Sequence, residues 1–336
     1  MVATGLPVFV FNAFPMWEPP LCGDQSGHKG PSHIEVMKRV FFIVGPTAAG
    51  KSELAAEVAR RLGAEIVSAD AFQVYRGLVL LTAKPDQNTL EKAPHHLIGT
   101  VPLPEEMNVE KYRAAAEGII QEIHARGKPV VIAGGSGFYI KALTHGLAKL
   151  PEANRKLREA LEQATNEELS RSLLALDPAA AKQIDRQNKR RLVRAVEICL
   201  LTGKPFSAER TQWNQSLPAN GMLVYRDRPD LYARINQRVE QMFESGVVEE
   251  VSALKNAGPT AEKTLGFTEI RALLAGEISK AECIAKIQQA TRHYAKRQLT
   301  WFQRQTNFPS LNLSAHGSSQ AIDLLLQNAS RVFAHE

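Results

Sequence analysis

Cysteine is scarce in this sequence, and long apolar runs are absent. The 336 residues include three cysteines, and none of them forms a Cys-x-x-Cys pair. So sparse a set argues against a disulfide framework or a zinc site and favours a reducing, cytoplasmic environment. No apolar run approaches the ~18 residues of a membrane-spanning helix, and no internal repeat is visible. These absences predict a soluble cytoplasmic protein without disulfides.

The charge is only mildly unbalanced. There are 41 lysine and arginine residues against 35 aspartate and glutamate residues, which gives a net charge of +6. A weakly basic protein permits an acidic partner such as nucleic acid but does not require one. The hydrophobic fraction of 44% and the charged fraction of 23% are ordinary for a globular protein, so composition alone does not decide the function.

The first 38 residues differ from the rest of the chain. They contain five prolines, show no helical or strand periodicity, and lack the basic segment and apolar core of a signal peptide. We expect residues 1–38 to form a disordered extension. Folded structure is expected to begin near Met37, which is also a candidate native start.

The next part of the sequence predicts strands joined by helices. Residues 40–44 form a short apolar run with β-branched and aromatic side chains, as in a buried parallel strand. A glycine-rich loop and a helical pattern follow, and a second strand at 65–68 leads to Asp70. A third strand at 130–133 ends in another glycine turn, at 134–137. This order predicts an α/β fold with a P-loop-type parallel sheet flanked by helices.

Residues 146–220 are expected to form a helical insertion. Strand-like runs disappear there, and alanine, glutamate, arginine, leucine and glutamine dominate. Leu192, Val196 and Leu200 form the apolar stripe of one helix. The predicted organisation is a disordered extension at 1–38, an α/β core with C-terminal helices at 39–145 and 221–315, the helical insertion at 146–220, and a tail at 316–336.

The strongest local signal is a complete Walker A pattern between the first strand and the helix. In this setting backbone N–H groups and the helix N-terminus attract an anion. Lys51 adds a cation for the phosphate groups, and Ser52 can hold Mg²⁺. The site therefore binds a phosphorylated ligand, which can be a diphosphate as well as ATP. The loop consists of Gly45, Pro46, Thr47, Ala48, Ala49, Gly50, Lys51 and Ser52.

Asp70 is the second candidate for chemistry. It follows the second strand, 19 residues after Lys51. In a right-handed βαβ unit this places it beside the P-loop, at the same edge of the sheet. Its carboxylate can then hold a metal ion or act as a general base. A structural role, as a helix cap or turn residue, is the third interpretation.

Seven segments, in order between about residues 41 and 304, resemble the sequence pattern of the tRNA dimethylallyltransferases. A P-loop alone is weak evidence for a family, whereas seven ordered segments are strong evidence. They are the P-loop, Ser68 to Gly77, Thr82 to Pro85 followed by Pro94 to Ile98, Gly134 to Tyr139, Arg190 to Glu197, Leu265 to Glu269, and Thr291 to Phe302.

The resemblance implies a bacterial-type, monomeric enzyme that uses Mg²⁺. Such an enzyme transfers a dimethylallyl group from dimethylallyl diphosphate to N6 of the adenosine at tRNA position 37. Asp70 corresponds to the residue that takes the proton from the adenine amine. Thr47, Lys51, Ser52 and Ser136 would surround the diphosphate. The segments that correspond to tRNA contacts contain Asp70, Ala71, Phe72, Gln73, Ser136, Arg158, Arg190, Arg191, Leu192, Val193, Arg194, Lys296, Arg297, Gln298, Trp301 and Gln303.

Residues 291–304 independently suit RNA binding, because they combine four basic residues with Tyr294 and Trp301. Basic side chains contact phosphates, and aromatic rings stack on bases that are extruded from a single-stranded loop. Taken alone, the pattern also fits a solvated basic helix with core aromatics.

Five positions depart from the family pattern. Ser136 keeps the hydroxyl group of the usual Thr, whereas Ala71 lacks that of the usual Ser. Leu81 stands where Gly is usual, Gly99 where Asp is usual, and Phe267 where Tyr is usual. These departures leave the chemistry in place and leave local geometry and tRNA affinity open.

Three other functions fit part of the pattern. An adenylate dimethylallyltransferase, which prenylates free AMP, ADP or ATP, would share the P-loop and Asp70 but would not need the basic segments. A small-molecule or nucleotide kinase would place ATP on Lys51 and could use 190–194 as an arginine-rich lid. A non-catalytic RNA-binding protein would not need to retain Lys51, Ser52 and Asp70.

Overall fold

The computed structural model describes residues 36–148, 150–210 and 220–334, and the structural statements that follow concern these residues. The extension expected at 1–38 therefore lies outside the described residues, apart from its last three positions. Val36, the first residue described, is buried and belongs to the main apolar cluster of the core.

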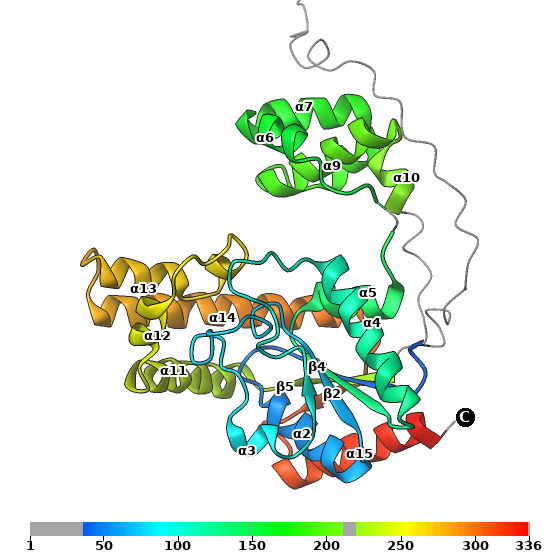
Figure 1. Cartoon of the computed structure of the whole chain (residues 1–336), viewed down its shortest axis with the longest axis vertical. Helices are drawn as coiled ribbons and strands as arrows, with labels where there is room; N and C mark the ends of the chain where they lie inside the picture. Colours follow the sequence, from blue (N-terminus) through cyan, green and yellow to red (C-terminus); the bar gives the residue numbers. More distant parts are fainter. Residues whose placement is uncertain (1–35, 149, 211–219, 335–336) are drawn as a thin grey trace, which may run out of the picture. The chain divides into compact units, whose positions relative to one another are not determined.

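A six-stranded parallel sheet forms the centre of the α/β core, with the strand order β3-β2-β4-β1-β5-β6. This confirms the fold class that the sequence predicts. Because β1 lies between β4 and β5, the loop that follows β1 opens near the middle of the sheet (Figure 1). The strands are β1 (Val40–Val44), β2 (Glu65–Ala69), β3 (His95–His96), β4 (Val130–Gly134), β5 (Asn220–Tyr225) and β6 (Ser310–Asn312).

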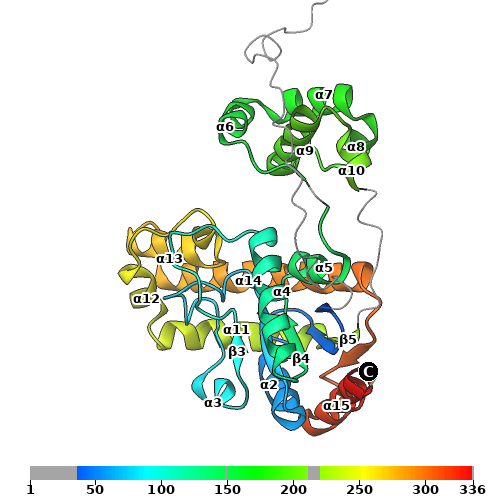
Figure 2. The ribbon, with the colours of Figure 1, turned by 45° about the vertical axis from the view of Figure 1, so that its right-hand side comes forward.

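Helices cover both faces of the sheet, and alternate residues of β1 pack toward different layers. Phe41 and Ile43 belong to the apolar cluster that contains α2 (Lys51–Leu62) and α15 (Ser318–Ala334). Phe42 belongs to the cluster on the other face. That face is covered by α4 (Val109–Ala125), α5 (Gly137–His145) and α14 (Lys280–Gln305) (Figures 1 and 2).

Of the remaining helices of the core, α11 (Arg228–Glu244) and α13 (Phe267–Leu274) pack against α14, whereas α3 (Gln87–Leu90) lies beside α2 (Figure 1). Leu231 and Ile235 of α11 form a small buried cluster with Ala295 of α14, so these two helices pack together. None of the described helices has the length and apolar character needed to cross a bilayer. The core elements not yet named are α12 (Val247–Ala253) and the 3₁₀ turn Ala261–Lys263.

The C-terminal residues contribute more to the core than the sequence suggests. The sequence predicts a tail at 316–336, but this segment contains α15, a helix of 17 residues. Ala321, Leu325 and Ala329 of α15 are fully buried in the same cluster as Phe41 and Ile43 of the central strand. Two of these three buried residues are alanines, so the apolar stripe is inconspicuous in the sequence.

In the described residues of the expected helical insertion, five helices form an apolar core of their own. Leu161, Leu169, Leu173 and Val196 are buried in this core. Glu197 is also completely buried there, where it pairs with arginine side chains. The helices are α6 (Arg155–Gln163), α7 (Asn166–Leu176), α8 (Pro178–Gln183), α9 (Lys189–Thr202) and α10 (Phe206–Arg210).

Candidate active site

The P-loop connects β1 to α2 at the centre of the sheet. A Cβ atom at Gly45, whose φ is 155°, would lie only 2.0 Å from the carbonyl oxygen of Val224, so glycine is required there. Gly50 has a φ of 101° and immediately precedes α2. Lys51 Nζ donates a hydrogen bond to Pro46 O across the loop, at 2.8 Å. Lysine and the helix N-terminus therefore meet in one place, as an anion site requires.

Asp70 lies directly after β2, and its turn is well defined. Its Oδ1 accepts hydrogen bonds from the backbone N–H groups of Phe72 at 2.9 Å and Gln73 at 3.2 Å. Oδ2 accepts no hydrogen bond from the described residues, so it is available to accept a proton. Thr47, Lys51 and Asp70 line the same polar cavity. The carboxylate thus both shapes its turn and faces the P-loop.

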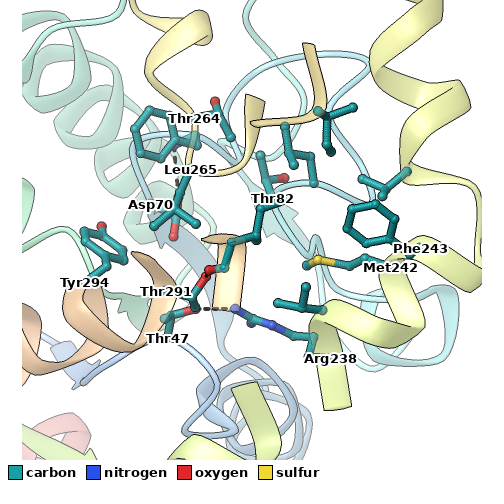
Figure 3. A pocket seen from close by; sticks show the side chains of 16 residues that line it. Thr47, Asp70, Thr82, Arg238, Met242, Phe243, Thr264, Leu265, Thr291 and Tyr294 are labelled. Carbon is teal, nitrogen blue, oxygen red and sulfur yellow. Dashed lines mark hydrogen bonds between the residues drawn. The ribbon is translucent and has the colours of Figure 1, made fainter. Parts of the chain in front are cut away.

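Three arginines, one just before α11 and two on it, contact the P-loop, and no sequence motif assigns them to the site. Arg234 and Arg238 are four residues apart on α11, so they share one face of the helix. This spacing is visible in the sequence and indicates a basic face on the helix. The neighbouring residues do not indicate which part of the protein this face contacts. Two of the hydrogen bonds are Arg226 Nε to Ala49 O at 3.0 Å and Arg234 Nε to Ala48 O at 3.1 Å. The third, from Arg238 Nη2 to Thr47 Oγ1 at 2.7 Å, is seen in Figure 3.

The cations of this site are poorly solvated. Desolvation lowers the pKa of Lys51 from 10.5 to about 8, although the nearby Asp70 carboxylate opposes the shift. Desolvation likewise lowers the pKa of Arg238 to about 10, again opposed by Asp70. Arg238 Nε is buried and has no hydrogen-bond partner among the described residues. A buried donor without a partner costs about 1–3 kcal/mol, so an anionic ligand that accepts a hydrogen bond from it would be favoured here.

Gln298 joins the two glycine-rich turns, and Ser136 joins one of them to the turn that carries Asp70. Gln298 accepts a hydrogen bond from the N–H group of Thr47 at 2.9 Å and donates one to Gly135 O at 2.8 Å. Ser136 Oγ accepts a hydrogen bond from the N–H group of Ala71 at 2.9 Å. Gln298 is buried, so the structure gives this residue, expected among the tRNA contacts, a role in joining two turns of the site.

A mainly apolar pocket adjoins the polar cavity. Thr47, Asp70, Thr82 and Arg238 line both of them. Figure 3 shows Arg238 reaching Thr47 near one side of this pocket, with Met242 and Phe243 close to Arg238. The other apolar lining residues are Phe72, Leu81, Val239, Val247, Leu265, Ile270 and Ile287. The site therefore combines an anion-binding part with an apolar part, and Asp70 belongs to both.

The RNA-binding residues expected on α14 divide into exposed and internal positions. Lys296, Arg297 and Gln303 are exposed. Trp301 lines a surface hollow together with Lys296 and Arg297, and its ring lies over Gly137. A hollow that combines basic groups with an indole ring suits phosphate contacts and base stacking. Residues 291–304 therefore form neither a fully solvated basic helix nor a fully buried one.

The RNA-binding residues expected in the insertion divide in the same way. Arg190 and Arg191 are exposed. Arg158 and Arg194 each bind the buried carboxylate of Glu197, at 3.0 Å and 2.7 Å, so their guanidinium groups already have a structural partner. Two further expected residues, Leu192 and Val193, are buried in the apolar core of the insertion and offer no exposed side chain for RNA.

The polar cavity has the donor set that Mg²⁺ prefers. Mg²⁺ takes oxygen ligands and in phosphate sites combines one or two protein groups with phosphate oxygens and waters. Ser52, the residue expected to hold the ion, lines the cavity together with Asp70 and Asp86. These residues fit a magnesium–diphosphate ligand.

Two of the departures from the family pattern have a structural explanation. Gly99 has a φ of 62°, in the left-handed region where glycine carries no penalty. Phe267 is buried, and the guanidinium group of Arg271 lies 5.2 Å from its ring centroid. A buried ring without a hydroxyl group needs no hydrogen-bond partner, so phenylalanine is suited to this position.

Comparisons with known proteins point to one family. A sequence model described as IPP transferase matches residues 73–305. The chain is 42% identical to the tRNA dimethylallyltransferase of Akkermansia muciniphila, in a match that covers 84% of this chain and 96% of the relative. It is 41% identical to the tRNA dimethylallyltransferase of Geobacter sulfurreducens, with 84% and 92% covered.

Solved structures give the same result. The full-length tRNA isopentenylpyrophosphate transferase of Bacillus halodurans is 31% identical, with a TM-score of 0.66 over 88% of this chain and 97% of that chain. A eukaryotic dimethylallyltransferase, studied in crystals while acting on tRNA, is 25% identical, with a TM-score of 0.72 over 84% of this chain and 77% of that chain.

Proposed function

The chain belongs to the IPP transferase family, and from this premise we propose that it transfers a dimethylallyl group from dimethylallyl diphosphate to N6 of adenosine 37 in tRNA. The observation that carries the proposal is the position of Asp70, which lines both the polar cavity of the P-loop and the adjoining apolar pocket. A diphosphate bearing a short hydrocarbon chain matches these two environments.

In the proposed reaction, the bond between C1 and the diphosphate oxygen of the donor breaks, and a bond from C1 to N6 of adenine forms. The electron pair of the broken bond stays on the diphosphate. Lys51, Arg238 and Thr47 meet at the P-loop, where they would stabilise this charge. The proton of the amine passes to Asp70 Oδ2, which accepts no other hydrogen bond from the described residues.

The tRNA would reach this site through an adenine extruded from the anticodon loop. Unstacking a base costs a few kcal/mol, and contacts with the rest of the loop must repay it. The exposed Lys296 and Arg297, with Trp301 beside them, can supply such contacts. We propose a monomeric enzyme, because all these groups come from one chain. A tRNA substrate would place it in the cytoplasm.

Removal of magnesium should abolish most of the activity. When bound, Mg²⁺ supplies positive charge to the diphosphate, which is worth several kcal/mol in metal-assisted reactions. A chelator is therefore expected to lower the transfer rate by about tenfold or more, and added Mg²⁺ to restore it. Ser52→Ala should raise the Mg²⁺ concentration needed for half-maximal rate. An unchanged rate in the chelator would exclude this cofactor.

The affinity for diphosphate should depend on pH through Lys51. Its pKa is lowered to about 8, so in the free enzyme the ammonium group loses its charge as the pH rises through this value. Binding of inorganic diphosphate, followed by calorimetry, is expected to weaken above about pH 8 by up to about tenfold per pH unit, and Lys51→Met should abolish this dependence.

The lowered pKa of Lys51 also makes the stability of the folded protein depend on pH. Stability should rise with pH in the range where the affinity for diphosphate falls. The unfolded chain keeps the lysine proton up to about pH 10.5, whereas the native protein releases it near pH 8. The cost of desolvating Lys51 is therefore present below pH 8 and is relieved as the pH rises from 8 to 10.5. Unfolding free energies of wild type and Lys51→Met, compared across this range, should converge; parallel curves would contradict the assignment.

The decisive assay compares three acceptors of labelled dimethylallyl: tRNA with adenosine at position 37, the same tRNA with guanosine there, and free AMP. Label on the first tRNA alone supports the proposal. Label on AMP indicates an adenylate dimethylallyltransferase instead. Consumption of ATP without any prenyl transfer indicates a kinase, and binding of tRNA without turnover indicates a non-catalytic RNA-binding protein.

A further inference from the structure

We infer that Leu81 limits the length of the prenyl donor by closing the apolar end of the donor pocket. The inference rests on the proposed function, because it assigns the apolar pocket to the hydrocarbon chain of the donor. It adds a specificity-determining residue that takes no part in the chemistry.

The loop that carries Leu81 runs from the polar cavity into the apolar pocket. Ala83 lines the polar cavity and is absent from the lining of the apolar pocket. Thr82 lines both, and Leu81 lines the apolar pocket alone. Along the chain from Ala83 to Leu81, the side chains thus move away from the diphosphate and into the space proposed for the hydrocarbon.

At this position Leu81 is part of a tightly packed wall. Its side chain is only 7% exposed. A Cβ atom placed on Gly266 would lie 3.0 Å from Leu81 Cδ1 and 3.3 Å from Ile287 Cδ1. The two side chains therefore pack closely against Gly266, where one added carbon atom would force them to shift by a few tenths of an ångström.

Hydrogen bonds on both sides hold Leu81 in place. On one side the carboxylate of Glu250 in α12 accepts hydrogen bonds from three consecutive backbone N–H groups. Such a set of bonds to a charged acceptor fixes the backbone more firmly than neutral bonds would. On the other side the side chain of Gln73 binds the next two carbonyl groups. The bonds are Val79 N and Leu80 N to Glu250 Oε2 at 2.8 Å each, Leu81 N to Glu250 Oε1 at 2.9 Å, and Gln73 Nε2 to Thr82 O at 3.2 Å and to Ala83 O at 3.0 Å.

This wall should make the enzyme discriminate against a donor with a longer hydrocarbon chain. Geranyl diphosphate has the same diphosphate and the same reactive allylic carbon as dimethylallyl diphosphate, but its chain is one isoprene unit longer. In the wild type its additional carbons would meet the side chain of Leu81, whose backbone is held in place by the flanking hydrogen bonds. Shortening the side chain of Leu81 should therefore relieve the discrimination against geranyl diphosphate.

The test measures kcat/KM for both donors with the same tRNA in wild type, Leu81→Val and Leu81→Ala. The preference for dimethylallyl over geranyl diphosphate is expected to fall stepwise, by roughly tenfold or more in Leu81→Ala, because small changes in an apolar pocket alter selectivity by about 10–200-fold. Leu81→Val removes a single methylene group, so it keeps the test available if Leu81→Ala does not fold.

Two further variants test whether a change in donor preference comes from the position of the Leu81 side chain or from a general disturbance of its loop. Val79→Ala changes an exposed side chain of the same loop, and its donor preference should equal that of wild type. Glu250→Gln leaves the side chain of Leu81 intact but weakens its anchor, so the preference should fall as in Leu81→Val.

The outcomes distinguish this inference from the proposed function. Wild type that transfers neither donor to tRNA would refute the proposed function itself. Wild type that uses dimethylallyl diphosphate while Leu81→Val and Leu81→Ala keep its donor preference would overturn the role of Leu81. A change in the KM for tRNA without a change in donor preference would also overturn it, because the pocket would then hold the adenine.

Discussion

Asp70→Asn should bind tRNA normally and transfer almost no dimethylallyl. The amide oxygen of asparagine can still accept the hydrogen bonds from Phe72 and Gln73, so the turn is kept. The amide nitrogen that replaces Oδ2 cannot take the proton of the adenine amine. Loss of a general base typically lowers kcat by about 10²–10⁴-fold. Single-turnover transfer with the tRNA dissociation constant measured in parallel checks both halves of this result.

Comparison with Asp70→Ala separates the two roles of this carboxylate. Alanine removes the proton acceptor and the cap of the turn together, so it should also disturb donor or tRNA binding. Asp323→Asn is a suitable control, because that carboxylate is 66% exposed on α15. Near-normal turnover in Asp70→Asn would show that Asp70 only shapes the turn, and another group would have to accept the proton.

The parts of the site that could be predicted from the sequence are those encoded locally. The P-loop is a continuous segment whose glycines, Lys51 and Ser52 are recognisable by spacing alone. Asp70 could be placed beside it because a βαβ unit has a fixed hand. The strands β1, β2 and β4 were likewise visible as short apolar runs, since a central parallel strand is buried on both faces.

What could not be predicted depends on contacts between distant parts of the chain. Arg238 meets Thr47 across 191 residues, and Gln298 meets the same residue across 251. Neither position differs locally from an ordinary polar residue of an amphipathic helix. The pairing of Arg158 with Glu197 is another such contact, across 39 residues. Similarity to a family could place Arg158 in an RNA-binding segment, but it could not show this buried partner.

Arg238→Ala is expected to lower kcat/KM for the donor by about 10²–10³-fold, the usual loss when one donor that stabilises developing charge is removed. Arg238 binds Thr47 Oγ1 at 2.7 Å, and its Nε is a buried donor without a partner among the described residues. A diphosphate oxygen would satisfy that donor. Arg238→Lys should recover part of the loss, because it keeps the charge but not the planar fork. Arg228→Ala on the same helix is the control, since Arg228 is exposed.

Inorganic diphosphate as an inhibitor distinguishes the two main variants. Arg238→Ala should bind it weakly, whereas Asp70→Asn should bind it at least as well as wild type, because removing a neighbouring negative charge favours an anion. Both should keep the wild-type affinity for tRNA. If Arg238→Ala bound diphosphate normally, the unpartnered donor would not face the leaving group, and Arg238 would act only by orienting Thr47. The anion site would then consist of the P-loop and Lys51. The presence of Arg238 in the lining of the apolar pocket would need another explanation.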